Sequence, residues 1–310
     1  MIQLYLCIGE YALCIGVLLP GVLPPRRNDC QKAVNRVCVE PIMRKSIRLR
    51  KETINTMFFD THAHYDDDWF QEDREDLIAS LPAAGISFVV NAGCDRASSE
   101  NSLALAHQHD FIFAAVGWHP HSAKEWDTES EGSIRQWAKD PKVVAIGEIG
   151  LDYHYDAAWK ETQQQVLEAQ LCLAEELNLP VIIHDREAHW DCMDIIRLHP
   201  NVRGVFHCYS GSAEMAKEIL SWGWYLGFNG AITMQGARRA LETIKMMPTD
   251  RILLETDCPY LAPMPRTDGR RNDSRKLPRI AEVVAQTCGT TVEVVAEVTT
   301  ENGKRFFGLK

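Results

Sequence analysis

Residues 143–184 read VVAIGEIGLDYHYDAAWKETQQQVLEAQLCLAEELNLPVIIH, and the fold assignment rests on their alternation. Two nearly continuous apolar runs, Val143–Ile149 and Pro180–His184, are typical of strands in a sheet whose faces are covered by helices. Between them, Lys160–Asn178 carries side chains of one helix face at intervals of three or four residues, and this period indicates a helix. The repeating positions are Val166, Leu167, Gln170, Leu171 and Ala174. A strand, a helix and a second strand predict a parallel βαβ unit, because parallel neighbours need a crossover connection.

The same alternation continues from Met57 to the end of the chain. The eight short apolar runs are Phe58–Thr61, Ser87–Ala92, Phe111–Gly117, Val143–Ile149, Pro180–His184, Val202–His207, Trp224–Phe228 and Arg251–Thr256. Eight such units in one segment predict a single-domain α/β fold, the (β/α)8 or TIM barrel, which takes about 250 residues. The alternative is a doubly wound open sheet, but the first strand is not followed by a Gly-rich phosphate loop. The last two helices are expected at about Leu277–Cys288 and Thr291–Phe307.

Residues 1–56 are interpreted as an N-terminal extension outside the fold, and residues 57–310 as the barrel domain. The extension begins with an apolar stretch, but its longest uncharged run, residues 11–25, is shorter than the roughly 20 residues of a membrane span and contains Pro20. A signal peptide would need positive charge before its apolar region, which is not evident here. Three readings stay open: extra translated sequence upstream of a start at Met57, a disordered extension, or a targeting segment.

The composition is that of an ordinary globular protein, with 45% hydrophobic and 25% charged residues among 310. It excludes a disordered tail protein, a collagen and a disulfide-stapled mini-protein. The net charge of −10 hides an asymmetry, because residues 1–57 carry nine basic and four acidic side chains and the remainder is strongly acidic. An acidic barrel argues against binding nucleic acid by charge alone. The ten cysteines form no CxxC pair, which favours reduced thiols and a cytoplasmic protein.

Metal-binding side chains recur where the predicted strands end, which is where the active sites of such barrels lie. These side chains are His62, His64, Glu148, His184, His207 and Asp257. On an extended strand, His62 and His64 point to the same face because they are two residues apart. Four imidazoles and two carboxylates suit zinc, manganese or another divalent ion and exceed the needs of one tetrahedral site. We therefore expect two metal ions about 3.5–4 Å apart, with Glu148 as the candidate bridging ligand.

Residues 57–310 resemble the TatD family of metal-dependent deoxyribonucleases, within the amidohydrolase-like barrels. The matching blocks are FFDTHAHYDD, VGWHPH, AIGEIGLDYH, LPVIIHDREA, GVFHCYSGS, GFNGAIT, ILLETDCPYLAP and ENGKRFFGL. The resemblance implies that His62, His64 and Asp257 hold one ion, that His184 and His207 hold the other, and that Glu148 bridges them. Family members often read RGxRNEP after the proline-rich loop, whereas this chain reads TDGRRNDS over 267–274, which retains Arg271 and Asn272.

The expected mechanism is hydrolysis of a phosphodiester by a metal-activated water, with Mg, Mn or Zn as the divalent ions. Glu148 and Asp257 are the candidate catalytic residues, and Asp257 is the candidate general base. The candidate substrate contacts are His119, His121, Asp152 and Arg271. Asp152 and His154 are alternatively expected to orient metal ligands. Tyr153, Tyr209 and Tyr260 are candidate stacking platforms for bases, although aromatic side chains at strand ends more often serve packing.

Two late loops carry a cluster of cations consisting of Arg238, Arg239, Arg266, Arg270, Arg271, Arg275 and Lys276. A local basic rim on an acidic body suits a single-stranded DNA end or a small phosphoester better than a long duplex. We therefore expect a 3'-5' exonuclease-like deoxyribonuclease, with no membrane partner required. The alternative is a hydrolase of small esters, amides or phosphoesters on the same site, because fold does not fix substrate. A metal-binding scaffold without turnover is the third class, but no ligand or base is missing.

Overall fold

The computed structural model of the chain describes residues 3–9, 12–18, 56–155, 157–266 and 269–310. Its contacts divide into two units, Met1–Ile54 and Asn55–Lys310. In the first unit, β1 (Gln3–Gly9) and β2 (Ala12–Leu18) pair as an antiparallel hairpin. Residues 19–55, on which most of the expected extension falls, lie outside the described residues. Whether residues 1–56 are extra translated sequence, a disordered extension or a targeting segment stays a prediction.

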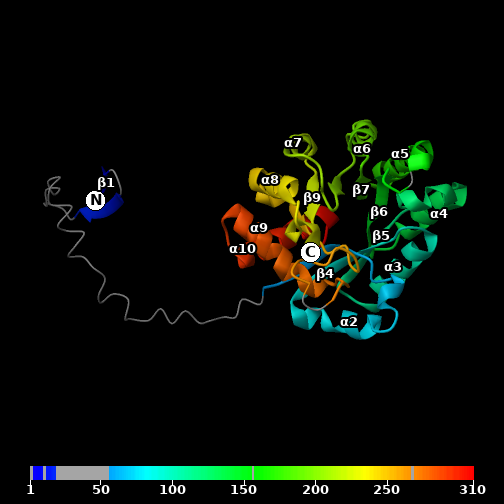
Figure 1. Ribbon diagram of the computed structural model, residues 1–310, viewed down its shortest axis with the longest axis horizontal. Coiled ribbons are helices and arrows are strands. Elements are labelled where there is room, and N and C mark those ends of the chain that lie inside the picture. Colours follow the sequence, from blue (N-terminus) through cyan, green and yellow to red (C-terminus); the bar gives the residue numbers. More distant parts are fainter. Residues whose placement is uncertain (1–2, 10–11, 19–55, 156, 267–268) are drawn as a thin grey trace. The chain divides into compact units, whose positions relative to one another are not determined.

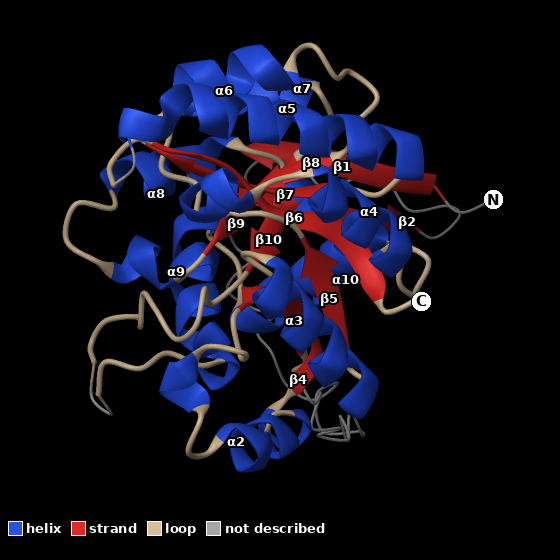
Figure 2. Ribbon diagram, turned by 90° about the vertical axis from the view of Figure 1, so that its right-hand side faces the viewer, coloured by secondary structure: helices blue, strands red, loops and turns tan. Residues whose placement is uncertain are grey.

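Eight parallel strands form the centre of the second unit, and they lie side by side in chain order (Figure 2). They are β3 (Phe58–Ala63), β4 (Ile86–Ala92), β5 (Ile112–Val116), β6 (Val143–Asp152), β7 (Val181–Arg186), β8 (Gly204–Phe206), β9 (Tyr225–Phe228) and β10 (Ile252–Leu254). The last strand meets the first, because Thr61 Oγ1 donates to the Leu254 carbonyl at 3.0 Å and a parallel bridge joins Ala63 to Cys258. The predicted (β/α)8 barrel is confirmed, and the open doubly wound sheet is wrong.

Helices cover the outside of the barrel and alternate with its strands (Figure 1). They are α2 (Arg74–Ser80), α3 (Arg96–Gln108), α4 (Thr128–Trp137), α5 (Lys160–Leu177), α6 (His189–Ile196), α7 (Ala213–Ser221), α8 (Arg238–Met246), α9 (Leu277–Cys288) and α10 (Val292–Phe307). The predictions for α5, α9 and α10 agree with these bounds to within a residue. α5 ends because Asn178 adopts a left-handed conformation with φ of 52°. Among the described helices, none is both long and apolar enough to cross a membrane.

Two apolar layers hold the barrel together. In β10, Leu253 belongs to the cluster inside the barrel. Its neighbours Ile252 and Leu254 belong to the other cluster, which lies between the strands and the helices. The same alternation places Ile182 of β7 inside the barrel, as expected when successive side chains point to opposite faces. Phe306 and Phe307 of α10 complete the inner cluster. These packed strands therefore form a fixed support for the loops that follow them.

Gly150 allows β6 and β7 to approach each other beyond the expected end of β6. The sequence predicts that this strand ends at Ile149, but pairing continues through Gly150 with His184 to Asp152 with Arg186. Gly150 has a φ of +147°, and a Cβ at this position would lie 1.9 Å from the His184 carbonyl oxygen. A residue without a side chain is therefore required to keep His184 in register.

We expect Gly150→Ala to destabilise the fold by about 3 kcal/mol, through overpacking and an unfavourable φ. The melting temperature should fall by roughly 6–12 °C, as followed by circular dichroism at 222 nm. Gly132→Ala is the control, because Gly132 lies in α4 and a Cβ there would meet nothing within 4 Å. The control should leave stability unchanged or slightly increased. Equal melting temperatures for the two variants would contradict the role of Gly150.

Candidate metal centre

The six predicted metal ligands converge at the C-terminal mouth of the barrel. His62 lies in β3, and His64 follows that strand; Glu148 and His184 lie in β6 and β7. His207 directly follows β8, and Asp257 follows β10. Within this set, the ligand atoms of His62, His64 and Glu148 lie within 4.8 Å of one another, as do those of His62, His207 and Asp257. Residues separated by up to 195 positions in the sequence are therefore brought to one site.

The two oxygens of Glu148 face different pairs of histidines. Oε2 lies 3.2 Å from His62 Nε2 and 3.5 Å from His64 Nε2. Oε1 lies 2.7 Å from His184 Nδ1 and 2.8 Å from His207 Nε2. Burial alone would raise the pKa of Glu148, but the charges of His207 and His62 hold that pKa well below its usual range. One carboxylate therefore presents one oxygen to each pair of histidines.

The donor set fits divalent cations. His64 Nδ1 lies 2.8 Å from the Ala92 carbonyl oxygen, to which it can only donate, so that the neutral ring keeps its Nε2 lone pair. That Nε2 lies 3.0 Å from His62 Nε2 and 3.4 Å from Asp257 Oδ1. Histidine ligands are commonly fixed in this way by a partner on the other ring nitrogen. Imidazole nitrogens and carboxylate oxygens in this mixture are suitable ligands for zinc or manganese.

Asp257 is held in a strained backbone conformation. Its φ is 57°, in the left-handed region, where Asp is among the few residues tolerated. Its N–H donates to the His62 carbonyl at 2.9 Å, and the N–H of His64 donates to the Cys258 carbonyl at 2.8 Å. Burial opposes ionisation, but the hydrogen bond with His64 and the charge of His207 lower the pKa of Asp257. Strain of this kind is typical of functional sites and here positions a carboxylate over the mouth.

A buried polar network beneath the ligands was not predicted from the sequence. Asp60 accepts hydrogen bonds from the Thr256 N–H at 2.9 Å, from Thr256 Oγ1 at 2.6 Å and from Ser274 Oγ at 2.6 Å. Asn272 Nδ2 donates to the Thr256 carbonyl at 2.8 Å. The network therefore joins β3, the residue before Asp257 and the stretch from Asn272 to Ser274. Ser274, where this chain departs from the family pattern, is one of its members.

Glu255 orients His207 and was also missed. Its Oε1 accepts hydrogen bonds from the Cys208 N–H at 2.6 Å and from Asn229 Nδ2 at 3.1 Å. The same oxygen lies 3.5 Å from His207 Nδ1, on the side of the ring opposite the Nε2 that faces Glu148. Glu255 and Asp257 are two residues apart, so their side chains are expected on the same face of an extended segment. This spacing could have indicated from the sequence that Glu255 belongs to the site.

His119, His121 and Asp152 lie beside the ligands. His119 Nδ1 accepts a hydrogen bond from the His121 N–H at 3.2 Å, so the neutral ring carries its proton on Nε2, 3.7 Å from Glu148 Oε1. Burial and the charge of His184 hold the pKa of His119 well below its usual range. Asp152 Oδ2 lies 3.2 Å from both His184 Nε2 and His121 Nε2. His119 is therefore a neutral donor, and Asp152 orients two imidazoles.

A cavity of about 710 Å³ opens above this centre. Its walls include Tyr260 and Tyr155, whose exposed fractions are 48% and 64%. Of the three tyrosines considered as stacking platforms, only Tyr260 lines this cavity, and its hydroxyl donates to Asp67 Oδ2 at 2.7 Å. Tyr153 and Tyr209 donate to Asp191 Oδ2 and to the Ser212 carbonyl. Tyr155 is the additional aromatic side chain that the sequence did not single out.

Arg271 is not among the residues that line this cavity. Its guanidinium forms a two-pronged ion pair with Asp73, at 2.7 and 2.6 Å, and also donates to the Trp69 carbonyl at 3.0 Å. Arg275, from the same expected basic rim, pairs with Asp273 at 2.8 Å. Both cations are therefore engaged by carboxylates of the protein. Contact between Arg271 and substrate stays a prediction.

A (β/α)8 barrel with four imidazoles and two carboxylates at its C-terminal mouth has the architecture of the metal-dependent hydrolases. The chain belongs to the family of TatD related DNases, whose family model matches residues 59–308. It is thus a metal-dependent hydrolase acting on ester bonds, as the sequence predicted.

Relatives of known name match the barrel over their whole length. The chain is 41% identical over 255 residues to the uncharacterized metal-dependent hydrolase YabD of Bacillus subtilis, covering 82% of this chain and 100% of that protein. It is 37% identical over 258 residues to the 3'-5' ssDNA/RNA exonuclease TatD of Erwinia amylovora, covering 81% and 100%. The crystal structure of YjjV, a TatD homologue from Escherichia coli, matches with a TM-score of 0.77 and 29% identity, covering 83% and 100%.

Proposed function

We propose that this protein is a 3'-5' exonuclease that hydrolyses phosphodiester bonds at the ends of single-stranded DNA or RNA. The observation that carries the proposal is the placement of Glu148, with each carboxylate oxygen facing a different pair of histidines. The similarity to an exonuclease of Erwinia amylovora over its full length supports the choice of substrate. A cytoplasmic location is part of the same proposal.

The proposed cofactor is a pair of divalent ions, Mg, Mn or Zn. His62, His64 and Asp257 would hold one ion, His184 and His207 the other, and Glu148 both. When bound, such ions lower the pKa of a coordinated water and neutralise charge on a phosphodiester. His119 also lies close to Glu148 and His184, but its Nε2 proton favours hydrogen-bond donation over metal binding.

Asp257 is the proposed general base. Its Oδ1 faces His62 Nε2 and His64 Nε2, at 3.6 and 3.4 Å, which leaves Oδ2 to accept a proton from the attacking water. The lowered pKa of Asp257 keeps the carboxylate ionised, so that Oδ2 has lone pairs for that proton. A base acts when it lies about 2.6–3.2 Å from the proton donor. Asp257 lines the cavity, so substrate and water can reach it.

The remaining polar side chains would bind and orient the phosphodiester. His119 would donate its Nε2 proton in a hydrogen bond to a phosphate oxygen, and being neutral it needs no compensating charge. Asp152 would keep His184 and His121 in their orientations through the contacts at 3.2 Å. Tyr260 and Tyr155 offer exposed rings for unpaired bases, whose stacking is tolerant of sequence.

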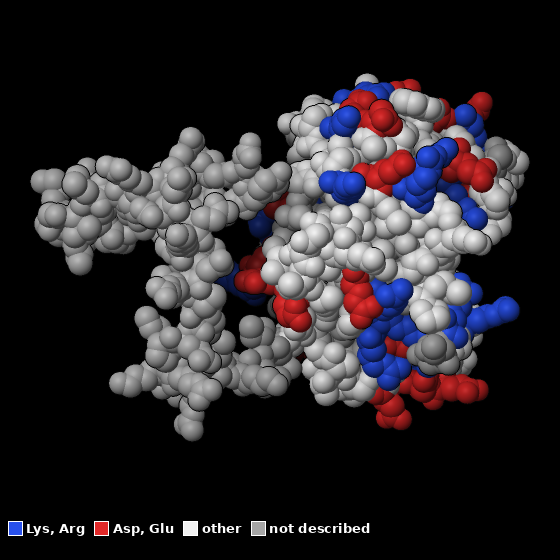
Figure 3. Space-filling model, turned by 60° about the vertical axis from the view of Figure 1, so that its left-hand side comes forward, with Lys and Arg blue, Asp and Glu red and all other residues white. Residues whose placement is uncertain are grey.

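The surface favours strand ends over long duplexes. The face shown in Figure 3 carries basic and acidic side chains in mixed groups instead of one broad basic surface. A cavity of about 710 Å³ lies within the usual size range of small-molecule sites and accommodates a strand end, not a double helix. Substrate would therefore be held by the metal centre and by a few local contacts.

The test is turnover of fluorescent single-stranded DNA and RNA, a double-stranded control and a generic ester, each with added metal and with EDTA. We expect the single strands to be cleaved and EDTA to abolish the activity. His62→Ala should lower the rate by about 10³-fold or more, because it removes a ligand from the centre. His107→Ala is the matched control, since the His107 side chain is 55% exposed and pairs with Asp140 on the surface. Cleavage of the ester alone would overturn the nuclease proposal in favour of a small-ester hydrolase.

A further inference from the structure

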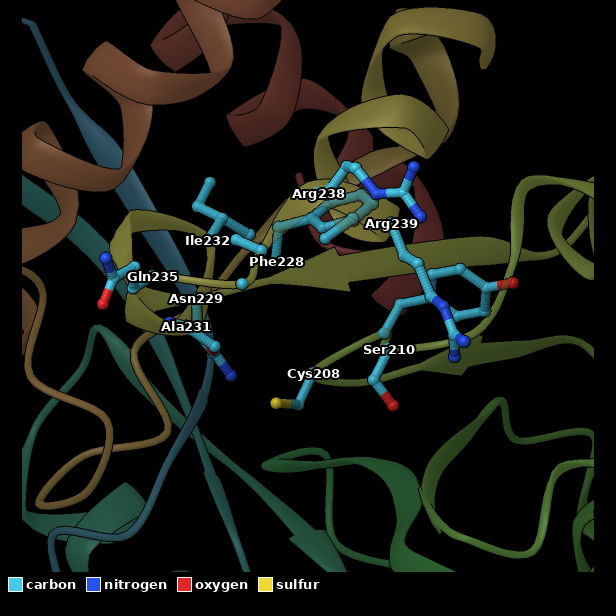
Figure 4. Close-up of a pocket in the computed structure, with 13 residues that line it drawn as sticks. Cys208, Ser210, Phe228, Asn229, Ala231, Ile232, Gln235, Arg238 and Arg239 are labelled. Atoms are coloured by element: carbon cyan, nitrogen blue, oxygen red, sulfur yellow. The ribbon is translucent and has the colours of Figure 1, made fainter.

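A second cavity adjoins the metal centre. It has a volume of about 460 Å³ and shares Cys208, Ser210 and Ala231 with the larger cavity above the ligands. Its remaining walls come from Tyr209 after β8, from the end of β9, from the segment after β9 and from the start of α8 (Figure 4). A molecule bound at the metal centre can therefore extend into this second cavity without leaving the protein surface.

The lining of the second cavity combines an apolar floor with polar and cationic groups. Phe228 and Ile232 form the floor and are buried. Ser210 and Gln235 are exposed polar side chains of the wall, and Arg238 and Arg239 stand at its edge. Cationic side chains beside aromatic ones are the combination by which proteins bind single-stranded nucleic acid without sequence preference. Small-molecule sites of this size are common.

The two arginines differ in their partners. Arg238 Nη1 lies 3.6 Å from Glu242 Oε1, one turn further along α8. Arg239 forms no ion pair with any carboxylate in the described part of the chain. In the view of Figure 4 its side chain extends toward Ser210, whereas that of Arg238 turns the other way. Arg239 therefore has a guanidinium available for an anion at the junction of the two cavities.

Arg239 lies near the metal cavity, because it lines the second cavity and the two cavities share Cys208 and Ser210. Its charge acts on His189, whose pKa is raised by a hydrogen bond to Asp185 while burial and the nearby Arg239 oppose the rise. Asp185 lines the metal cavity and is joined to His189 at 2.6 Å. The Asp185 carboxylate is therefore engaged by His189.

We propose that this second cavity binds the nucleotide next to the scissile phosphodiester, with Arg239 on its phosphate and the Phe228–Ile232 floor against its sugar and base. The inference rests on the proposed nuclease function and adds a subsite to it. A guanidinium matches a phosphate through two parallel hydrogen bonds. Because the floor is apolar and offers no pattern of donors, binding is expected to be independent of base identity.

The experiment compares Arg239→Gln with the wild-type protein on two substrates, in the presence of the metal. The first is single-stranded oligo-dT of three or more nucleotides. The second is thymidine 5'-(p-nitrophenyl phosphate), which has a scissile diester but no second nucleotide. Arg239→Gln should raise the KM for oligo-dT about tenfold with kcat nearly unchanged. Hydrolysis of the nitrophenyl ester should be unaffected.

Further variants and a salt titration distinguish the loss of the Arg239 charge from a structural effect of the substitution. Arg239→Lys should restore most of the KM, and Arg239→Gln should reduce the dependence of log(kcat/KM) on log salt by about 0.7. Arg238→Gln should change KM less than threefold. Arg197→Gln is the surface control, because Arg197 pairs with Glu218 at 2.7 Å.

The outcomes distinguish the subsite from the nuclease function. If wild-type protein degrades oligo-dT and Arg239→Gln does so with the same KM and salt dependence, the subsite is wrong and the nuclease function stands. Equal losses on both substrates would instead place Arg239 at the reacting phosphate, which also overturns the subsite. If wild-type protein hydrolyses only the nitrophenyl ester, the nuclease function fails and the subsite fails with it.

Discussion

Glu148→Ala is expected to release both metal ions and to reduce kcat/KM on single-stranded DNA by about 10³-fold or more. The reason is the position of the carboxylate, which lies 3.2 Å from His62 Nε2 through one oxygen and 2.7 Å from His184 Nδ1 through the other. Removing one side chain therefore removes a ligand from each half of the centre. The four histidines would also lose the negative charge that they share.

Metal content after dialysis, measured by plasma mass spectrometry, tests this expectation directly. Glu187→Gln is the control, because Glu187 is an exposed carboxylate that pairs with His154 at 2.8 Å and lies outside the ligand set. The control should retain its metal and its rate. Retention of both ions by Glu148→Ala would contradict the bridging role, and retention of one would show that Glu148 serves a single ion.

Asp257→Asn should lower kcat by about 10³-fold even when metal is supplied in excess, because an amide cannot accept the proton from the attacking water. The substitution preserves the size of the side chain, so the packing around Asp257 should remain. Metal affinity should also fall, since the lost carboxylate oxygen lies 3.4 Å from His64 Nε2 within the ligand cluster. An excess of metal distinguishes the loss of metal affinity from the loss of the general base. It restores metal occupancy of the site but does not replace the Asp257 carboxylate.

Rates at increasing metal concentration provide the measurement, together with the melting temperature as a check of folding. Asp194→Asn is the matched control, because the Asp194 side chain is 69% exposed and pairs with Arg197. Full recovery of kcat by Asp257→Asn at saturating metal would show that Asp257 is a ligand only. The general base would then have to be another group.

The order of the barrel elements could be predicted from local pattern. Val143–Ile149 and Pro180–His184 are apolar runs of strand length around a helix of period 3.6, and β6, β7 and α5 form there. The sequence indicated that the barrel closes only through the number of strand–helix units, which is eight. The contact that decides it, between Thr61 and Leu254, joins residues 193 positions apart, and no local pattern contains it.

The ligand set could be predicted for a related reason. Once the strands are parallel members of one barrel, their C-terminal ends share one mouth, so residues such as His62, His184 and Asp257 must approach each other. The position of Arg271 could not be obtained in this way. Its loop follows no strand directly, and its ion pair with Asp73 was fixed by packing between distant segments.

The sequence by itself determined the alternation of strands and helices and the types of side chain at the strand ends, because both follow from periodicity and spacing along the chain. Only the tertiary structure decided which oxygen of Glu148 faces which histidines, that Asp60 and Ser274 support the site from below, and that Arg239 stands free beside a second cavity. The physical reason is that these properties depend on distances and hydrogen-bond partners between segments far apart in sequence, which the packing of the barrel sets.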